Sequence, residues 1–290
     1  MSRVADYFSL VRFSHSVFAL PFALCGAWLA AGGVPSLRTL ALVILCAVAA
    51  RTAAMGFNRL VDARVDARNP RTASREIPAG RVGRGAASAL VLASAAVFVG
   101  GAWGLNALAG WLALPVLAVL LGYSLMKRVH WSAHLVLGLA LGLAPLGAWI
   151  AVRGAIDASV APVVWLAAAV LSWVAGFDLV YACQDADFDR ESGLHSIPAR
   201  FGVARALQIS ALLHAGTIAA LVLVGWTAGL AWGWWAALAL AALLLLWEHR
   251  LVRPDDLSRV NMAFFTLNGW LGVLLFAGLA LDLWMRGGRA

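Results

Sequence analysis

Two groups of aspartates share the same spacing in a chain that contains few acidic residues. Asp62 and Asp66 are four residues apart, and Asn58 comes four residues before them. Asp185 and Asp189 repeat this spacing much further along the chain. Residues four apart lie on one face of an α-helix. Because only 14 of the 290 residues are Asp or Glu, the repetition predicts two clusters of oxygen ligands with a shared purpose.

A divalent cation would explain these clusters. Like charges four residues apart repel one another, and the penalty grows where a membrane excludes water. Carboxylate and amide oxygens suit Mg²⁺, which also binds phosphate oxygens and water. If the two clusters face each other, they can hold Mg²⁺ ions that bridge to a diphosphate. The candidate ligands are Asn58, Asp62 and Asp66 in one cluster and Asp185 and Asp189, with Asp187 between them, in the other.

Four basic residues accompany the aspartates on the same predicted side of the membrane: Arg71, Arg75, Lys127 and Arg128. Arginine forms paired hydrogen bonds with phosphate oxygens, and lysine supplies a point charge. We therefore expect these bases to bind the oxygens that the metal leaves free. The alternative is a set of solvated loop charges that only determine topology, which does not explain aspartate pairs repeated at one spacing.

The composition identifies the elements that must position these residues. The chain is 63% hydrophobic and 12% charged, whereas a soluble domain averages about 45–50% apolar and about 25% charged residues. This balance excludes an ordinary soluble protein, and it is the opposite of a disordered one. Apolar runs of roughly 20 residues recur, enough to cross about 30 Å of hydrocarbon. We predict an all-α polytopic bundle that forms a single membrane domain over residues 1–290.

About nine transmembrane helices are expected, joined by two long polar loops near Asn58–Gly83 and Tyr181–Ala204. Both loops continue into an Ile-Pro-Ala step, at 77–79 and 197–199. This repetition suggests two related halves around a central cavity, although a chance match of three common residues is the alternative. The predicted spans are 16–33, 39–57, 85–104, 107–125, 132–152, 160–181, 205–226, 229–249 and 262–284.

The basic residues predict the orientation of the bundle. With the N-terminus in the cytoplasm, 17 of the 22 Lys and Arg residues fall in cytoplasmic segments. We therefore expect a multi-pass protein of the cell inner membrane, with both aspartate loops cytoplasmic and the C-terminus external. The net charge of +8 is attributed to topology and lipid headgroups rather than to nucleic acid. The three cysteines show no zinc or disulfide spacing, and His130, His134, His214 and His249 show no metal-binding spacing. Asp178 lies two turns before the second aspartate group.

A diphosphate at the cytoplasmic face of an apolar bundle implies a lipid tail among the helices, as in a polyprenyl diphosphate. Mg²⁺ and basic groups would stabilise the departing diphosphate. Aromatic faces and the exclusion of water would stabilise the allylic carbocation. An electron-rich aromatic ring would then attack this cation, so no protein nucleophile is required.

Residues 58–66 (NRLVDARVD), followed by the stretch through Gly80, resemble the first aspartate motif of the UbiA family of intramembrane prenyltransferases. Residues 181–189 (YACQDADFD), followed by Ser-Ile-Pro at 196–198, resemble the second motif. Tyr123 with Lys127 and Arg128 is similar to the basic step after the family's fourth span. The resemblance covers nearly the whole chain, although Arg59 departs from the residue that many members carry.

The resemblance implies Mg²⁺-dependent transfer of a polyprenyl group from its diphosphate to a small aromatic acceptor. It implies catalytic roles for Asp62, Asp66, Asp185 and Asp189. The residues that it implies for substrate binding are Asn58, Arg71, Arg75, Tyr123, Lys127, Arg128 and Tyr181. The chain most resembles the 4-hydroxybenzoate branch of ubiquinone and menaquinone biosynthesis. The segment 177–202 also resembles relatives that act on 1,4-dihydroxy-6-naphthoate in the futalosine route to menaquinone, so the acceptor stays open.

Two other classes of protein are alternatives. A transporter also uses intramembrane acids and related halves, but its acids are expected near the midplane rather than at the ends of spans. A purely structural membrane subunit gives no reason for two spaced aspartate groups.

Overall fold

The computed structural model describes residues 3–11 and 19–287, and in these ranges the chain is helical with no β-strand. The elements are α1 (Arg3–Leu10), α2 (Leu20–Ala31), α3 (Leu37–Asp66), α4 (Arg84–Leu105), α5 (Ala107–Met126), α6 (Ala133–Arg153), α7 (Ala161–Ala182), α8 (Ala186–Glu191), α9 (Ile197–Phe201), α10 (Val203–Thr227), α11 (Trp232–Leu251), α12 (Val260–Met262) and α13 (Asn268–Gly287). Short 3₁₀ turns precede α7 and α8, and a π-helical turn, Ala263–Leu267, precedes α13.

The prediction of an all-α membrane bundle is confirmed. Eight helical segments in the described part of the chain are long and apolar enough to cross a bilayer, and they coincide with the second to ninth predicted spans. The first predicted span, 16–33, corresponds to the 12-residue helix α2, and its first residues lie outside the described ranges.

The tight turn between α4 and α5 depends on one asparagine. Asn106 ends α4 and begins α5, and its side chain accepts a hydrogen bond from the backbone N–H of Ala109 at 2.8 Å. Its amide also donates to the carbonyls of Ile150 and Ala151 at the end of α6. An N-cap of this kind satisfies backbone groups that a helix terminus leaves without partners. It therefore separates two spans with almost no connecting loop.

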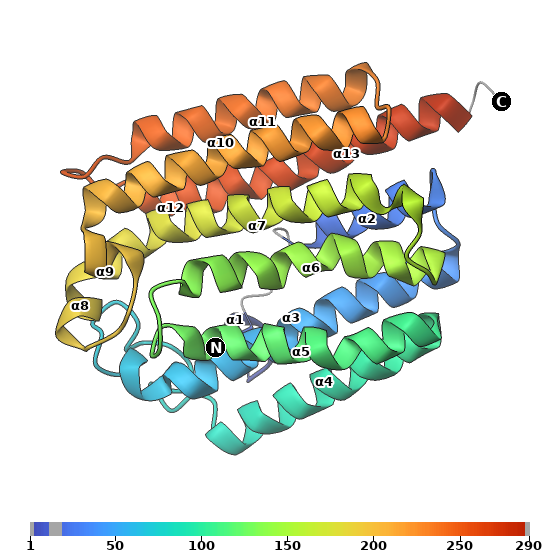
Figure 1. The fold of residues 1–290 in the computed structure, drawn as a ribbon. Coiled ribbons are helices and arrows are strands. Elements are labelled where there is room, and N and C mark those ends of the chain that lie inside the picture. Colours follow the sequence, from blue (N-terminus) through green and yellow to red (C-terminus); the bar gives the residue numbers. More distant parts are fainter. Residues whose placement is uncertain (1–2, 12–18, 288–290) are drawn as a thin grey trace.

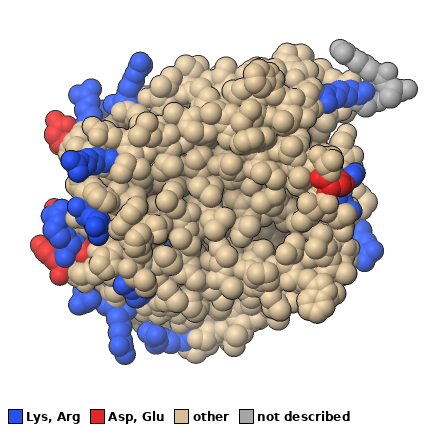
Figure 2. All heavy atoms as spheres, viewed as in Figure 1, with Lys and Arg blue, Asp and Glu red and all other residues tan. Residues whose placement is uncertain are grey.

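The long helices run side by side, with α8, α9 and the loop after α3 at one end (Figure 1). Lys and Arg side chains gather mainly at this same end, and the sides of the bundle are almost free of charge in the view of Figure 2. This is the end that the sequence predicts to be cytoplasmic.

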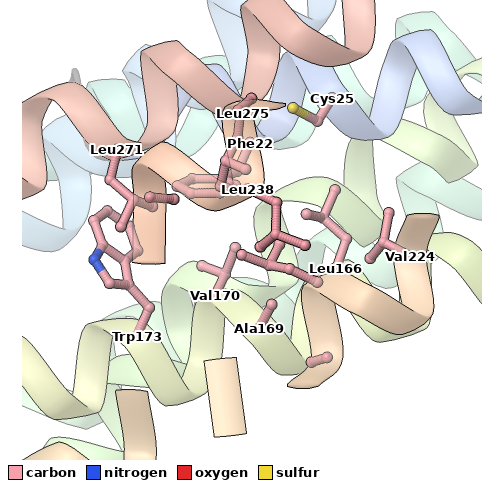
Figure 3. Packing of buried hydrophobic residues seen from close by; sticks show 14 of the residues in the cluster. Phe22, Cys25, Leu166, Ala169, Val170, Trp173, Val224, Leu238, Leu271 and Leu275 are labelled. Carbon is pink, nitrogen blue, oxygen red and sulfur yellow. The ribbon is translucent and has the colours of Figure 1, made fainter. Parts of the chain in front are cut away.

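The two halves of the bundle differ in how their interiors are filled. Helices α7, α10, α11 and α13 pack around a dense core that includes Trp173, Phe22 and Leu271 (Figure 3). Gly142 lets α6 approach α7, because a Cβ atom there would lie 2.8 Å from the Ala167 carbonyl oxygen. In contrast, helices α3 to α6 enclose an apolar cavity of about 380 Å³. The filled half supports the site, and the hollow half has room for an apolar ligand.

Candidate functional site

The structure brings both aspartate groups to one polar cavity of about 160 Å³ at the basic end of the bundle. Helix α3 continues beyond its apolar part to Asp66, so Asn58, Asp62 and Asp66 lie on successive turns. The Asn58 side chain donates to Asp62 Oδ2 at 3.1 Å. On the other side, α7 ends at Ala182, and the 3₁₀ turn and α8 carry Asp185 and Asp189. All five of these side chains line the cavity.

Asp62 is buried and neutralised by two bases from the end of α5. Its carboxylate lies 3.0 Å from Lys127 Nζ and 2.7 Å from Arg128 Nη2. Arg128 also donates to the carbonyls of Val61 and Ser124, which fixes its guanidinium between α3 and α5. Buried charges are tolerated when they are paired and hydrogen-bonded in this way. Lys127 and Arg128 therefore belong to the same site as the first aspartate group.

Asp66 is paired on one oxygen only. Arg75 Nη1 lies 2.7 Å from Asp66 Oδ1. The second oxygen, Oδ2, is buried and has no hydrogen-bond partner among the described residues. Buried polar atoms in proteins are usually satisfied, and an exception calls for an explanation such as a missing ion.

Asp185 links the second group to the loop that follows the first. Arg71 forms a two-pronged pair with its carboxylate, with Nε 2.9 Å from Oδ1, and Asn69 donates to the same oxygen at 3.1 Å. Arg71 also donates to the Tyr181 hydroxyl at 2.9 Å. Partial burial lowers the pKa of Arg71, but the hydrogen bonds and negative charge of Asp185 outweigh this, so its pKa is raised. The guanidinium therefore stays charged.

The donor chemistry of this cavity fits a hard divalent cation. Carboxylate and amide oxygens from two sides line one small space, and Asp66 Oδ2 has no partner there. Within the described residues, no three Asp, Glu, His or Cys side chains already lie together as a ligand set. Arg71, Arg75, Lys127 and Arg128 instead pair with three of the aspartates. Metal binding would therefore require some of these bases to move to another anion.

A second cavity of about 280 Å³ extends the polar one toward the interior. It shares Asp62 and Asp185 with the polar cavity, and aromatic side chains contribute to its wall. These aromatic residues are Tyr123, Phe177, Tyr181 and Phe264. The apolar cavity adjoins it in turn, because both are lined by Arg51, Met55, Tyr123, Leu137 and Leu141. Three adjoining cavities thus lead from the aspartates to the hollow half of the bundle.

Arg51 lies at the junction of the second and apolar cavities, a role that the sequence did not reveal. It lies within span two, and among the described residues no carboxylate forms an ion pair with it. Its Nε atom is buried and has no hydrogen-bond partner among the described residues. A charged residue inside a span is by itself a sign of function. That was the one signal in the sequence that pointed to this residue.

A histidine and an aspartate from neighbouring helices also face the second cavity. His134 Nδ1 of α6 lies 2.7 Å from Asp178 Oδ2 of α7. The other ring nitrogen, Nε2, accepts a hydrogen bond from the backbone N–H of Ile197 at 3.4 Å. With both ring nitrogens engaged, His134 holds Asp178 in place. Sequence spacing could not show this pair, because the two residues come from different helices.

Comparison with known proteins places this architecture among prenyltransferases. The model of the UbiA prenyltransferase family matches residues 19–272. The 4-hydroxybenzoate octaprenyltransferase of Alkalilimnicola ehrlichii is 35% identical, over 98% of this chain and 97% of that protein. The enzyme of the same name from Serratia proteamaculans is 33% identical, over 89% of this chain and 87% of that protein.

Solved structures show the same fold. The apo structure of a UbiA homologue from Aeropyrum pernix has a TM-score of 0.84 and 36% identity, covering 92% of this chain and 98% of that one. A UbiA homologue from Archaeoglobus fulgidus, bound to DMAPP and Mg²⁺, has a TM-score of 0.75 and 20% identity, covering 96% and 99% of the two chains.

Proposed function

The chain belongs to the UbiA prenyltransferase family, and from this premise we propose that it transfers a polyprenyl group from polyprenyl diphosphate to 4-hydroxybenzoate with the help of Mg²⁺. Curated relatives at 33–35% identity carry the name 4-hydroxybenzoate octaprenyltransferase. The observation that carries the proposal is the series of three adjoining cavities, polar at the aspartates and apolar between α3 and α6. One substrate with a charged head and a long hydrocarbon tail matches this series.

The polar cavity would bind the diphosphate head. Mg²⁺, when bound, would neutralise charge on the departing diphosphate. Arg71, Arg75 and Lys127 now pair with the aspartates and line the same cavity. They would turn to phosphate oxygens, which Arg binds through paired hydrogen bonds. The proposed metal ligands are Asn58, Asp62, Asp66, Asp185 and Asp189, and the proposed diphosphate contacts are Arg71, Arg75, Lys127 and Arg128.

The second cavity would hold the reacting carbon. Tyr123, Phe177, Tyr181 and Phe264 present aromatic side chains to it. Such rings stabilise a nearby cation, and exclusion of water from the space beside them would protect the cation from capture. The tail would extend into the 380 Å³ apolar cavity.

Arg51 and Asp178 would serve the aromatic acceptor. Arg51 forms no ion pair among the described residues, and its guanidinium at the junction of the cavities suits the carboxylate of 4-hydroxybenzoate. In the reaction, the allylic C–O bond breaks and its electron pair leaves with diphosphate, while a ring carbon bonds to the prenyl carbon. The displaced ring proton would pass to Asp178, which His134 holds in the cavity wall.

A second acceptor, 1,4-dihydroxy-6-naphthoate, carries the same carboxylate, so Arg51 does not distinguish the two. Both acceptors lead to a quinone, ubiquinone or menaquinone. Membership of a prenyltransferase family favours the enzyme over the transporter that the sequence alone left open. We place the protein in the cell inner membrane with the aspartate end in the cytoplasm and the C-terminus outside, in agreement with its basic residues.

One assay tests this proposal. Membranes that contain the protein receive labelled polyprenyl diphosphate and Mg²⁺, with 4-hydroxybenzoate and 1,4-dihydroxy-6-naphthoate offered in parallel. We expect labelled, prenylated 4-hydroxybenzoate. Transfer to the naphthoate alone would make the naphthoate the acceptor in place of 4-hydroxybenzoate. Transfer to neither compound would overturn the proposal.

A further inference from the structure

Three polar side chains form a hydrogen-bonded chain inside the filled half of the bundle, outside the site described above. Glu248 of α11 and Asn268 of α13 are both fully buried. The Asn268 amide donates to Glu248 Oε2 at 3.1 Å, and Asn268 Oδ1 accepts from the Trp173 indole N–H at 2.6 Å. A carboxyl group inside a membrane span is costly and is usually associated with function. Its retention here therefore calls for an explanation.

The same asparagine also holds an irregular turn of helix. Its amide donates to the Ala263 carbonyl at 3.1 Å, at the start of the π-helical turn Ala263–Leu267. Such π turns are rare and occur often at functional sites. This one carries Phe264 and Phe265, and Phe264 lines the second cavity. Asn268 thus connects the buried carboxyl group to a segment that forms part of the cavity wall.

An aromatic series leads from Trp173 to that wall. The rings of Trp173 and Phe177 pack edge-on, with their centroids 4.9 Å apart. The rings of Phe177 and Phe264 also pack edge-on, with their centroids 5.1 Å apart. Phe264 in turn lies 4.4 Å from the ring of Tyr181. The last three rings line the second cavity. Trp173 is absent from that lining and lies in the buried core (Figure 3). Trp173 therefore supports the wall without taking part in it.

The aromatic wall of the second cavity, formed by Phe177, Phe264 and Tyr181, reaches the proposed diphosphate site at Tyr181. The Tyr181 hydroxyl accepts from Arg71, which pairs with Asp185. Trp173 is also held on its backbone side, where His214 Nε2 lies 3.3 Å from its carbonyl oxygen. Because interiors are close-packed, a shift of Trp173 must move the rings packed on it.

We propose that Glu248 and Asn268 are positioning residues, which hold Trp173 and the π turn so that Phe177, Phe264 and Tyr181 face the allylic cation. This inference rests on the proposed function. The attraction between a cation and an aromatic ring requires the cation to lie over the ring face within about 6 Å. A displaced wall would stabilise the cation less and admit water, which converts the prenyl cation to the prenyl alcohol with release of a proton.

A matched pair of substitutions tests the proposal. Trp173→Phe removes the indole N–H that Asn268 accepts and leaves an aromatic ring. Trp234→Phe is the control, because Trp234 is equally buried in the same core and its N–H donates to the Leu221 carbonyl at 3.2 Å. Trp234 does not contact the wall rings in the described aromatic series. Both variants lose one buried hydrogen bond, so their melting temperatures should fall by similar amounts.

The readout is the ratio of prenylated acceptor to prenyl alcohol, measured together with kcat and KM. In Trp173→Phe we expect kcat to fall on the order of tenfold, as for a modest displacement of reacting groups, and the share of alcohol to rise. KM for the acceptor should change little. In Trp234→Phe both kcat and the ratio should stay close to those of the wild type. Equal product ratios in the two variants would overturn the proposal.

A second pair keeps the test valid if Trp173→Phe does not fold. Glu248→Leu removes the acceptor for Asn268, whereas Glu248→Gln keeps an oxygen in its place. We expect Glu248→Gln to recover most of the product ratio lost in Glu248→Leu, and no difference between them would contradict the positioning role. A wild-type protein that transfers no prenyl group would instead refute the proposed function.

Discussion

Arg71 forms a two-pronged ion pair with Asp185, and this contact joins loops 114 residues apart in the sequence. Asn69 donates to the same carboxylate at 3.1 Å, so one short loop segment holds the second aspartate group against the first. The arrangement places a basic side chain against three of the proposed metal ligands, Asp62, Asp66 and Asp185. In the proposed reaction, a diphosphate bound with Mg²⁺ would give the basic side chains a new anionic partner and the aspartates a new cationic partner.

The proposed metal ligands can be tested by removal of one charge. Asp62→Asn and Asp185→Asn should each lower turnover by at least about 100-fold, because the leaving diphosphate loses electrostatic stabilisation. Asp187→Asn is the matched control, since Asp187 lies between Asp185 and Asp189 but is exposed and pairs only with Arg190 among the described residues. Turnover is measured with labelled prenyl diphosphate, alongside thermal unfolding. A near-wild-type rate in either site variant would contradict the metal role.

Removal of the metal should weaken the binding of the diphosphate while the protein stays folded. With Mg²⁺ present, a non-hydrolysable prenyl diphosphate at 100 times its Kd should stabilise the protein by about 2.7 kcal/mol, and chelation should remove most of this effect. The measurement is the melting temperature in detergent with and without EDTA. Without the analogue, EDTA should change the melting temperature little, because basic side chains pair with three of the aspartates. An identical shift with and without Mg²⁺ would argue against a metal-bridged diphosphate.

Arg51 should determine the affinity for the acceptor's carboxylate. Arg51→Leu should raise KM for 4-hydroxybenzoate by roughly tenfold or more, since a charged hydrogen-bonded pair contributes about 1.5–3 kcal/mol. KM for the prenyl diphosphate should change less. Arg64→Leu, on the exposed side of the same helix, provides the control.

An uncharged acceptor makes this test sharper. The methyl ester of 4-hydroxybenzoate has no carboxylate for Arg51 to bind, so the wild type and Arg51→Leu should treat it alike. If the substitution impairs use of the ester as much as use of the acid, Arg51 has a different role.

Asp282 should affect stability rather than catalysis. This residue is 1% exposed, and its carboxylate accepts hydrogen bonds from the backbone N–H groups of Ala231, Gly233 and Trp234 at 2.7–3.1 Å. It thus caps the start of α11 from α13. Asp282→Ala should lower the free energy of unfolding by about 1–3 kcal/mol, because buried N–H groups lose their acceptor. Thermal unfolding measures the loss, and kcat at low temperature should be retained.

A conservative variant distinguishes capping from general packing at this position. Asp282→Asn keeps one oxygen acceptor and should lose less stability than Asp282→Ala. Equal losses in the two variants would indicate that volume, rather than hydrogen bonding, is what Asp282 contributes.

Much of the fold could be predicted because its signals are local. A helix that crosses a membrane requires about 20 apolar residues in succession, and such runs are legible without knowledge of their neighbours. The predicted spans 85–104 and 107–125 also agree with the boundary that the structure has at Asn106, although so short a turn left their division open in the sequence. The first predicted span agrees least well with the structure. The described helix α2 has 12 residues, and the segment before it lies outside the described ranges.

The candidate site was likewise predictable only where its residues are close in sequence. Asn58, Asp62 and Asp66 share a helix, so their spacing alone predicts that they share a face. The same holds, approximately, for Asp185 and Asp189. The assignment of these residues as metal ligands stays a prediction. Their meeting in one cavity depends on the packing of α3 and its loop against α7 and α8.

The sequence by itself determined the membrane bundle, its spans and the two groups of acids, because hydropathy and helical periodicity act over a few turns of one chain segment. Only the tertiary structure decided which side chains meet between helices. It placed Arg51 between two cavities, paired His134 with Asp178, and connected Glu248 to Trp173 through Asn268. Such contacts depend on the rotation and depth of each helix against its neighbours, which are set by the packing of the whole bundle and by no local pattern.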